Sequence, residues 1–131
     1  MKLTMQGEYA IRAMLELARE YPSGKLIPAK ELALRQDIPP VFLTKTLSLL
    51  AKAGLIINHR GSRGGIRLAK DASKITIKDV VEAIEGPFRL NMCLGVAGAC
   101  DRKPGCKVHR VWHRAQEAML KELSVTLDKV I

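Results

Sequence analysis

The sequence of 131 residues predicts a mainly α-helical protein with one small β-hairpin and a long C-terminal helix. Three observations lead to this prediction. Apolar residues recur at helical steps of three and four over most of the chain. Two short strand-like runs flank one glycine-rich segment. A final apolar stripe continues at helical spacing from about 107 to 130. Since no apolar run approaches the roughly 20 residues that span a bilayer, we expect a cytoplasmic protein without a membrane partner.

Three helices are expected in the first part of the chain, over 5–20, 28–36 and 40–53. Pro-Ser-Gly at 22–24 ends the first, and Gly54 ends the third. A short turn joins the second and third helices, which is typical of a helix-turn-helix. The alternative is any helical hairpin that has a polar outer face.

The third of these helices is expected to expose hydroxyl and ammonium groups. Thr44, Ser48 and Lys52 follow one another at steps of four, and Lys45 flanks them. Such groups reach phosphates and base edges in a major groove. This face is therefore a candidate DNA-reading surface.

A β-hairpin is expected directly after these helices, with strands over 55–60 and 66–68. Its tip is rich in glycine and carries Arg63 and Ser62, with Arg60 beside them. Helix, turn, helix and hairpin in this order predict a winged helix-turn-helix domain. The hairpin of that fold lies along the DNA backbone or inserts an arginine into a minor groove, so Arg60 and Arg63 are its candidate contacts.

The charge of the chain is unevenly distributed. The formal net charge is +9, and residues 40–78 hold eight basic side chains and one acidic side chain, Asp71. This excess favours a polyanion such as double-stranded DNA as the partner, and we expect no small-molecule substrate. The alternative is a solvated basic face that keeps the protein in solution.

Two further helices are expected after the hairpin. Thr76 and Asp79 form a capping-box pattern in front of a helix over 77–85. The last helix, over about 107–130, is longer than a small winged helix can cover by itself. We therefore expect a homodimer, with a helix folded back on its own domain as the alternative. The expected division is a DNA-binding domain over 1–87, a loop over 88–106 that carries all three cysteines, and a dimerisation helix over 107–131.

All three cysteines lie in one segment with many glycines, and His109 follows the last of them. Cys93, Cys100 and Cys106 are separated by gaps of six and five residues. An odd number of cysteines in a cytoplasmic protein indicates a metal site or a redox sensor rather than a disulfide. A zinc site, a two-iron cluster and a thiol switch near Lys107 and other basic residues all remain open. A cysteine enzyme has no oxyanion-hole motif to support it, so we do not expect an enzyme.

The chain resembles the IscR/NsrR class of bacterial winged-helix repressors, which carry an iron–sulfur cluster. The resemblance covers nearly the full length and rests on residues 1–4, 7–10, 38–55, 60–65 and 70–73 and on the cysteine segment. His109, three residues after the last cysteine, is similar to the histidine of the IscR branch.

This resemblance implies a homodimer with crossed C-terminal helices that controls the genes of iron–sulfur cluster biogenesis. It implies a [2Fe–2S] cluster on Cys93, Cys100, Cys106 and His109, and promoter choice that depends on cluster occupancy. In the NsrR branch a carboxylate at the place of Glu8 is the fourth ligand. Glu8 is therefore a rival to His109, and it would suit a [4Fe–4S] cluster and nitric oxide sensing. A zinc or thiol protein-interaction module is the remaining alternative.

Three positions depart from the pattern of the class. The first gap between cysteines is longer than is usual in IscR-type proteins, which keeps the cluster type open. Thr44 stands where the IscR branch has a glutamate that discriminates between promoters, and Val41 stands where a serine would. A missing carboxylate removes an acceptor for cytosine. We therefore expect this protein to prefer a different DNA sequence from the better-known members of the class, and we expect Val41 to be one of the contact residues.

Overall fold

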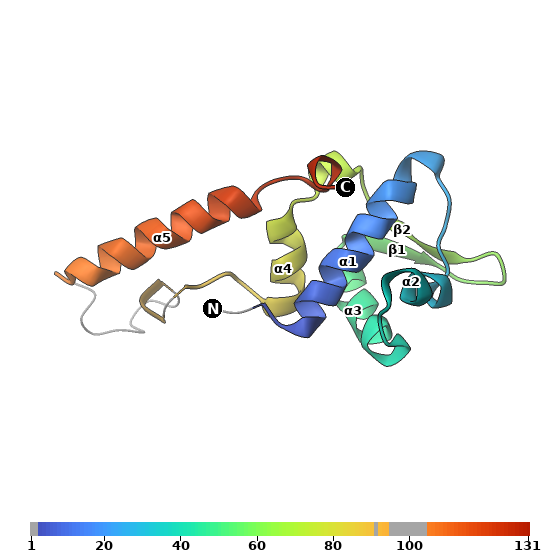
Figure 1. Ribbon diagram of the computed structural model, residues 1–131, viewed down its shortest axis with the longest axis horizontal. Helices are drawn as coiled ribbons and strands as arrows, with labels where there is room; N and C mark the ends of the chain where they lie inside the picture. The colour runs from blue at the N-terminus through green and yellow to red at the C-terminus, as the bar shows by residue number, and fades with distance from the viewer. Residues whose placement is uncertain (1–2, 91, 95–104) are drawn as a thin grey trace.

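The structure is a computed structural model, and it describes residues 3–90, 92–94 and 105–131. The helices and strands follow one another as α1 (Met5–Glu20), α2 (Ala29–Gln36), α3 (Pro40–Lys52), β1 (Ile56–His59), β2 (Gly65–Leu68), α4 (Ile77–Glu85) and α5 (Lys107–Leu123). Figure 1 shows α1 to α4 and the hairpin packed together, with α5 extending away from them. The predicted fold class, a mainly helical winged helix-turn-helix with a small hairpin and a long C-terminal helix, is confirmed.

Helix α1 forms the centre of the core. Thr4 caps it by accepting a hydrogen bond from the Gly7 amide at 3.1 Å, and the helix buries Met14 and Leu17. Helices α2 to α4 and the hairpin contribute fully buried aliphatic side chains to the same cluster, among them Leu32, Leu43, Leu50, Ile66, Leu68 and Val80. Each large side chain of this kind stabilises the fold by about 1.5–3 kcal/mol.

A tight turn joins α2 to α3. Asp37 adopts the left-handed region with a φ of 51°, and the amide of Ile38 donates to the carbonyl of Ala33 at 2.9 Å. Ile38 is buried, and Pro40 then occupies the first turn of α3. The turn therefore sets the direction in which α3 leaves the core.

The hairpin is antiparallel, with Ile56 opposite Leu68 and His59 opposite Gly65. Its tip requires glycine, because a Cβ on Gly64 would lie 2.0 Å from the His59 carbonyl oxygen. Ile27 pairs with Ile66 through two backbone hydrogen bonds of 3.0 and 2.8 Å. These bonds attach the hairpin to the segment in front of α2.

Helix α4 begins at the predicted capping box. The side chain of Thr76 accepts from the Asp79 amide, and the Asp79 carboxylate accepts from the Thr76 amide, both at 3.0 Å. The predicted helix over 77–85 is therefore confirmed at both ends. No helix in the described part of the chain combines the length and apolar character needed to cross a membrane.

The prediction of one unbroken helix from 107 to 130 is wrong. Helix α5 ends at Leu123, and a single 3-10 turn, η4 (Leu127–Lys129), follows it. Leu127 is completely buried in the core formed by α1 to α4, so the end of the chain returns to the winged-helix domain. The apolar pattern of the sequence continues past Leu123 because Leu127 is also apolar. Leu127 packs in this core, however, and does not belong to the apolar stripe of α5.

Candidate functional site

The exposed face of α3 carries all five of its predicted DNA-contact residues. They are Val41, Thr44, Lys45, Ser48 and Lys52, and each is exposed. The opposite face is buried and consists of Leu43, Thr46, Leu47 and Leu50. This division follows from the helical spacing, because residues three and four apart share one face.

Two threonines of α3 use their hydroxyl groups within the helix. The Thr44 hydroxyl donates to the Pro40 carbonyl at 3.0 Å, and the buried Thr46 hydroxyl donates to the Phe42 carbonyl at 2.8 Å. The bond of Thr46 satisfies a polar group that would otherwise be costly to bury. The bond of Thr44 uses its proton, while the oxygen keeps a lone pair and the methyl group is unaffected.

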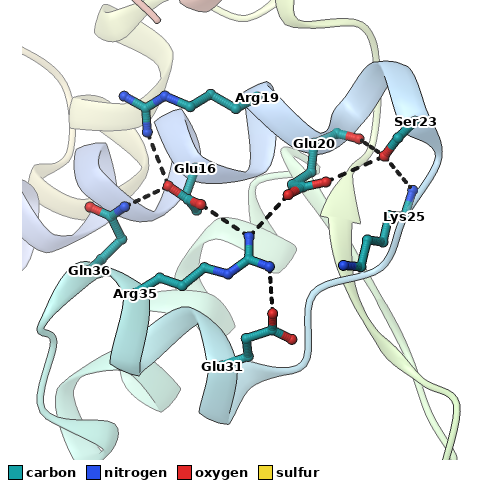
Figure 2. A network of polar contacts seen from close by, with 8 residues as sticks. All are labelled: Glu16, Arg19, Glu20, Ser23, Lys25, Glu31, Arg35 and Gln36. Carbon is teal, nitrogen blue, oxygen red and sulfur yellow. Dashed lines mark hydrogen bonds and ion pairs between the residues drawn. The ribbon is translucent and has the colours of Figure 1, made fainter.

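A network of charged side chains holds α2 against α1 (Figure 2). The Arg35 guanidinium contacts Glu16 and Glu20 of α1, both at 3.1 Å, and Glu31 of its own helix. Gln36 also donates to Glu16, at 2.6 Å. Hydrogen bonds from Arg35 to Glu31, Glu20 and Glu16 raise the pKa of the guanidinium above its already high ordinary value. The network fixes the first helix of the helix-turn-helix, and so it supports the position of α3.

The hairpin presents Arg60, Ser62 and Arg63 in exposed positions at and beside its tip. Arg67, by contrast, makes hydrogen bonds within the hairpin. Its Nε donates to His59 Nε2 at 3.2 Å, and its terminal nitrogen donates to the Leu68 carbonyl at 3.0 Å. The hairpin thus offers exposed polar side chains at and beside its tip, while the basic side chain of Arg67 is fixed along its strands.

Sequence reasoning did not single out a basic pocket beside the hairpin. Arg67 of β2 and Lys25 of the preceding segment both line it, together with Asp71, and its volume is about 510 Å³. Arg67 belongs to the basic segment noted above, so its charge was visible in the sequence. The presence of Lys25 in the same pocket was not visible, because it depends on the pairing of Ile27 with Ile66.

The cysteine segment is described only at its two ends. Cys93 is buried in the 3-10 turn η3 (Met92–Leu94), and Cys106 is half-buried at the N-cap of α5. Cys100 lies outside the described residues. Among those that are described, no three His, Cys, Asp or Glu side chains lie close enough together to hold a metal ion.

The two predicted fourth ligands have different surroundings. His109 lies in the first turn of α5, and its Nδ1 is buried with no hydrogen-bond partner in the described part of the chain. Glu8 lies in the first turn of α1, where its carboxylate pairs with Arg12 at 2.7 Å and stays 48% exposed. The Glu8 carboxylate already has a charged partner, whereas the buried His109 nitrogen has none among the described residues. The imidazole of His109 therefore needs a further partner more than the carboxylate of Glu8 does.

The donors at the two ends fit a soft or borderline metal group. Cys93 and Cys106 are free thiols, and Nδ1 of His109 has no hydrogen-bond partner among the described residues. The Gln116 side chain of α5 accepts from the Leu90 amide at 2.8 Å, which brings α5 beside the chain that leads to Cys93. Thiolates and imidazole suit iron–sulfur clusters and zinc equally well.

Comparison with known proteins decides the family. Residues 3–131 match the sequence model of the family described as Rrf2, iron-dependent transcriptional regulator. The chain belongs to the Rrf2 family. It is 33% identical over 132 aligned positions to the HTH-type transcriptional regulator IscR of Klebsiella pneumoniae, covering all of this chain and 80% of the relative.

Solved structures of Rrf2-type regulators share the fold. IscR of T. potens has a TM-score of 0.77 at 24% identity, and the match covers 99% of this chain and 85% of that one. CymR of B. subtilis, named as a global cysteine regulator, has a TM-score of 0.80 at 26% identity, with coverage of 99% and 95%. The chain thus resembles transcriptional regulators that carry different names. This resemblance supports the role of transcriptional regulator and does not identify the signal that the chain senses.

Proposed function

We propose that this Rrf2-family transcriptional regulator binds promoter DNA as a homodimer and responds to an iron–sulfur cluster that it carries, and that it controls genes of iron–sulfur cluster biogenesis. The observation that carries the DNA-binding part is the exposed face of α3, with its hydroxyl and ammonium groups, beside a hairpin with exposed arginines. The relative named IscR, which aligns with the whole of this chain, supports the cluster.

In this proposal α3 enters the major groove and the hairpin contacts the flanking backbone. Lys45, Lys52 and Ser48 donate hydrogen bonds to phosphates or base edges. Arg60 and Arg63 contact phosphates or enter a narrow minor groove, and Ser62 lies between them in the sequence. Phosphate contacts of this kind supply affinity that falls as the salt concentration rises.

The homodimer would form through α5. No residue of this helix is buried in the chain by itself, and Val108, Val111 and Trp112 are 53%, 59% and 38% exposed. An apolar pocket of about 230 Å³ lies near its other end and is lined by Leu3, Ile11, Ile77, Val81, Phe88, Met119 and Leu123. A second copy covers such surfaces and places two α3 helices for successive major grooves, about 34–36 Å apart.

We assign Cys93, Cys100, Cys106 and His109 as the ligands of a [2Fe–2S] cluster. A bound cluster supplies iron that changes its redox state or is lost under stress. Cys93 precedes the segment outside the described residues, whereas Cys106 and His109 begin α5, so these ligands join the two sides of the connection between α4 and α5. By holding both sides, the four side chains would fix the direction of α5 and with it the spacing of two α3 helices.

The test is an absorption spectrum of protein purified without oxygen, with iron and sulfide analysis. The proposal predicts a red-brown protein with about two iron and two sulfide per chain. A colourless protein that retains zinc would overturn it. His109→Ala is expected to change the spectrum and Glu8→Ala to leave it unchanged, and the reverse result would assign Glu8.

A second candidate is an Rrf2 regulator that senses another signal. The structural likeness to CymR, a cysteine regulator, favours this candidate, as do the free thiols of Cys93 and Cys106. One version is a nitric-oxide or redox sensor with a [4Fe–4S] cluster, and another is a zinc or thiol module. The same spectrum, with iron, sulfide and zinc analysis, separates the versions, because each predicts different amounts of these elements per chain.

A further inference from the structure

Val41 is exposed to a degree that packing within the chain does not explain. It is 80% exposed, the highest value among the exposed large apolar side chains of the described residues. It lies in the first turn of α3, on the face that also carries Thr44, Lys45 and Ser48. An exposed apolar side chain at the N-terminal end of a DNA-reading face is available to contact apolar groups of a ligand.

The other side chains of this face offer few kinds of hydrogen-bonding group. Helix α3 contains no Asp, Glu, Asn or Gln, so it offers no carboxylate to cytosine N4 and no side-chain amide to adenine. Lys45, Lys52 and Ser48 supply donors, which suit guanine and phosphate. The Thr44 hydroxyl already donates to the Pro40 carbonyl at 3.0 Å, so it has no donor left for a base and offers an oxygen lone pair and a methyl group.

We propose that Val41, with the methyl group of Thr44 one turn further along, recognises the C5-methyl group of thymine in the major groove. The inference rests on the proposed DNA binding by α3 and adds the base that the helix prefers. Thymine is the one base that presents an apolar group in this groove. Val41 and Thr44 lie about 4.5 Å apart along the helix axis, close to the roughly 3.4 Å between bases, so they suit one thymine or two successive thymines.

The probe is a duplex selected from random DNA by the purified full-length protein. Each thymine is then replaced in turn by deoxyuridine, which removes only the methyl group. We expect one or two positions in each half-site where this replacement weakens binding about fourfold, the effect of exposing one buried methyl group. The measurement is fluorescence anisotropy at one fixed salt concentration.

Protein variants assign the effect to Val41. In Val41→Ala the deoxyuridine replacement at one of these positions, the thymine that Val41 contacts, is expected to have no further effect, whereas Val41→Ile keeps the sensitivity. Leu34→Ala is the matched control, since Leu34 is an apolar residue of α2 that is 76% exposed and lies outside the face of α3. It is expected to behave as the unchanged protein does.

Two results would overturn the inference. An equal loss on deoxyuridine replacement in the unchanged protein and in Val41→Ala refutes recognition by Val41 but leaves DNA binding intact. Selection that recovers no duplex, together with binding that does not depend on salt, refutes the proposed function and the inference with it.

Discussion

The backbone amide of Leu127 donates a hydrogen bond of 2.9 Å to the carbonyl of Ile75, which joins the end of the chain to the segment in front of α4. The amide of Ile77 donates in return to the carbonyl of Val125 at 3.0 Å. Leu127 itself is buried in the winged-helix core. The C-terminal end of α5 is therefore attached to the domain that carries α3.

Leu127→Ala is expected to lower the free energy of unfolding by about 2–5 kcal/mol, because it removes a fully buried side chain and leaves a cavity. Urea denaturation followed by circular dichroism measures the loss. Lys129→Ala, two residues further on and exposed, is the matched control and is expected to change little. A loss of similar size in both variants would contradict the core position of Leu127.

Arg60→Ala is expected to weaken specific DNA binding much more than Lys129→Ala does, because Arg60 flanks the hairpin tip and Lys129 lies in the C-terminal turn. Removing one phosphate contact should also reduce the slope of affinity against salt concentration by about one. Anisotropy titrations at several salt concentrations give both quantities. Small and equal effects of the two substitutions would argue against the hairpin as a DNA contact.

Arg35→Gln is expected to lower the midpoint of thermal unfolding more than Arg19→Gln does. Arg35 contacts three carboxylates and bridges α1 and α2, whereas Arg19 contacts Glu16 alone within α1. The same substitution should weaken DNA binding, since α2 supports the turn that directs α3. An unfolding midpoint that falls equally in both variants would show that the bridge between the helices adds no stability.

Asp71 makes a small, acid-sensitive contribution to stability. Hydrogen bonds from the Ser73 amide and hydroxyl, with the charge of Lys74 nearby, lower the pKa of its carboxyl group in the folded state. The contribution is therefore present above the ordinary pKa of about 3.9 and disappears as the pH falls through the lower folded value. Asp71→Asn should lose stability at neutral pH and show a weaker dependence of stability on pH below about 4. Urea denaturation at a series of pH values tests this, and identical dependences would contradict it.

The elements that depend on local signals were predicted well from the sequence. The helix over 77–85 has a capping box at one end and Gly86-Pro87 at the other, and its bounds agree with the structure. The exposed face of α3 followed in the same way from spacing alone. These features involve residues within one or two turns of each other, so tertiary contacts were not needed to find them.

The features that the sequence did not show depend on contacts between distant residues. The end of α5 is set by the pairing of Thr126 with Thr76 and by the burial of Leu127, neither of which changes the local helical pattern. The contacts of Arg35 with Glu16 and Glu20 join residues 19 and 15 positions apart. The cysteine ligands were identified by residue type and spacing, and their assignment stays a prediction because Cys100 lies outside the described residues.

The central claim is that cluster occupancy at the start of α5 controls how the protein holds DNA. It is tested most directly by the affinity of cluster-loaded and cluster-free protein for one selected promoter duplex, measured by anisotropy at equal salt without oxygen. The account predicts that the two dissociation constants differ by about 5- to 150-fold, the usual range for coupling between two sites. Equal dissociation constants for the two forms would contradict it.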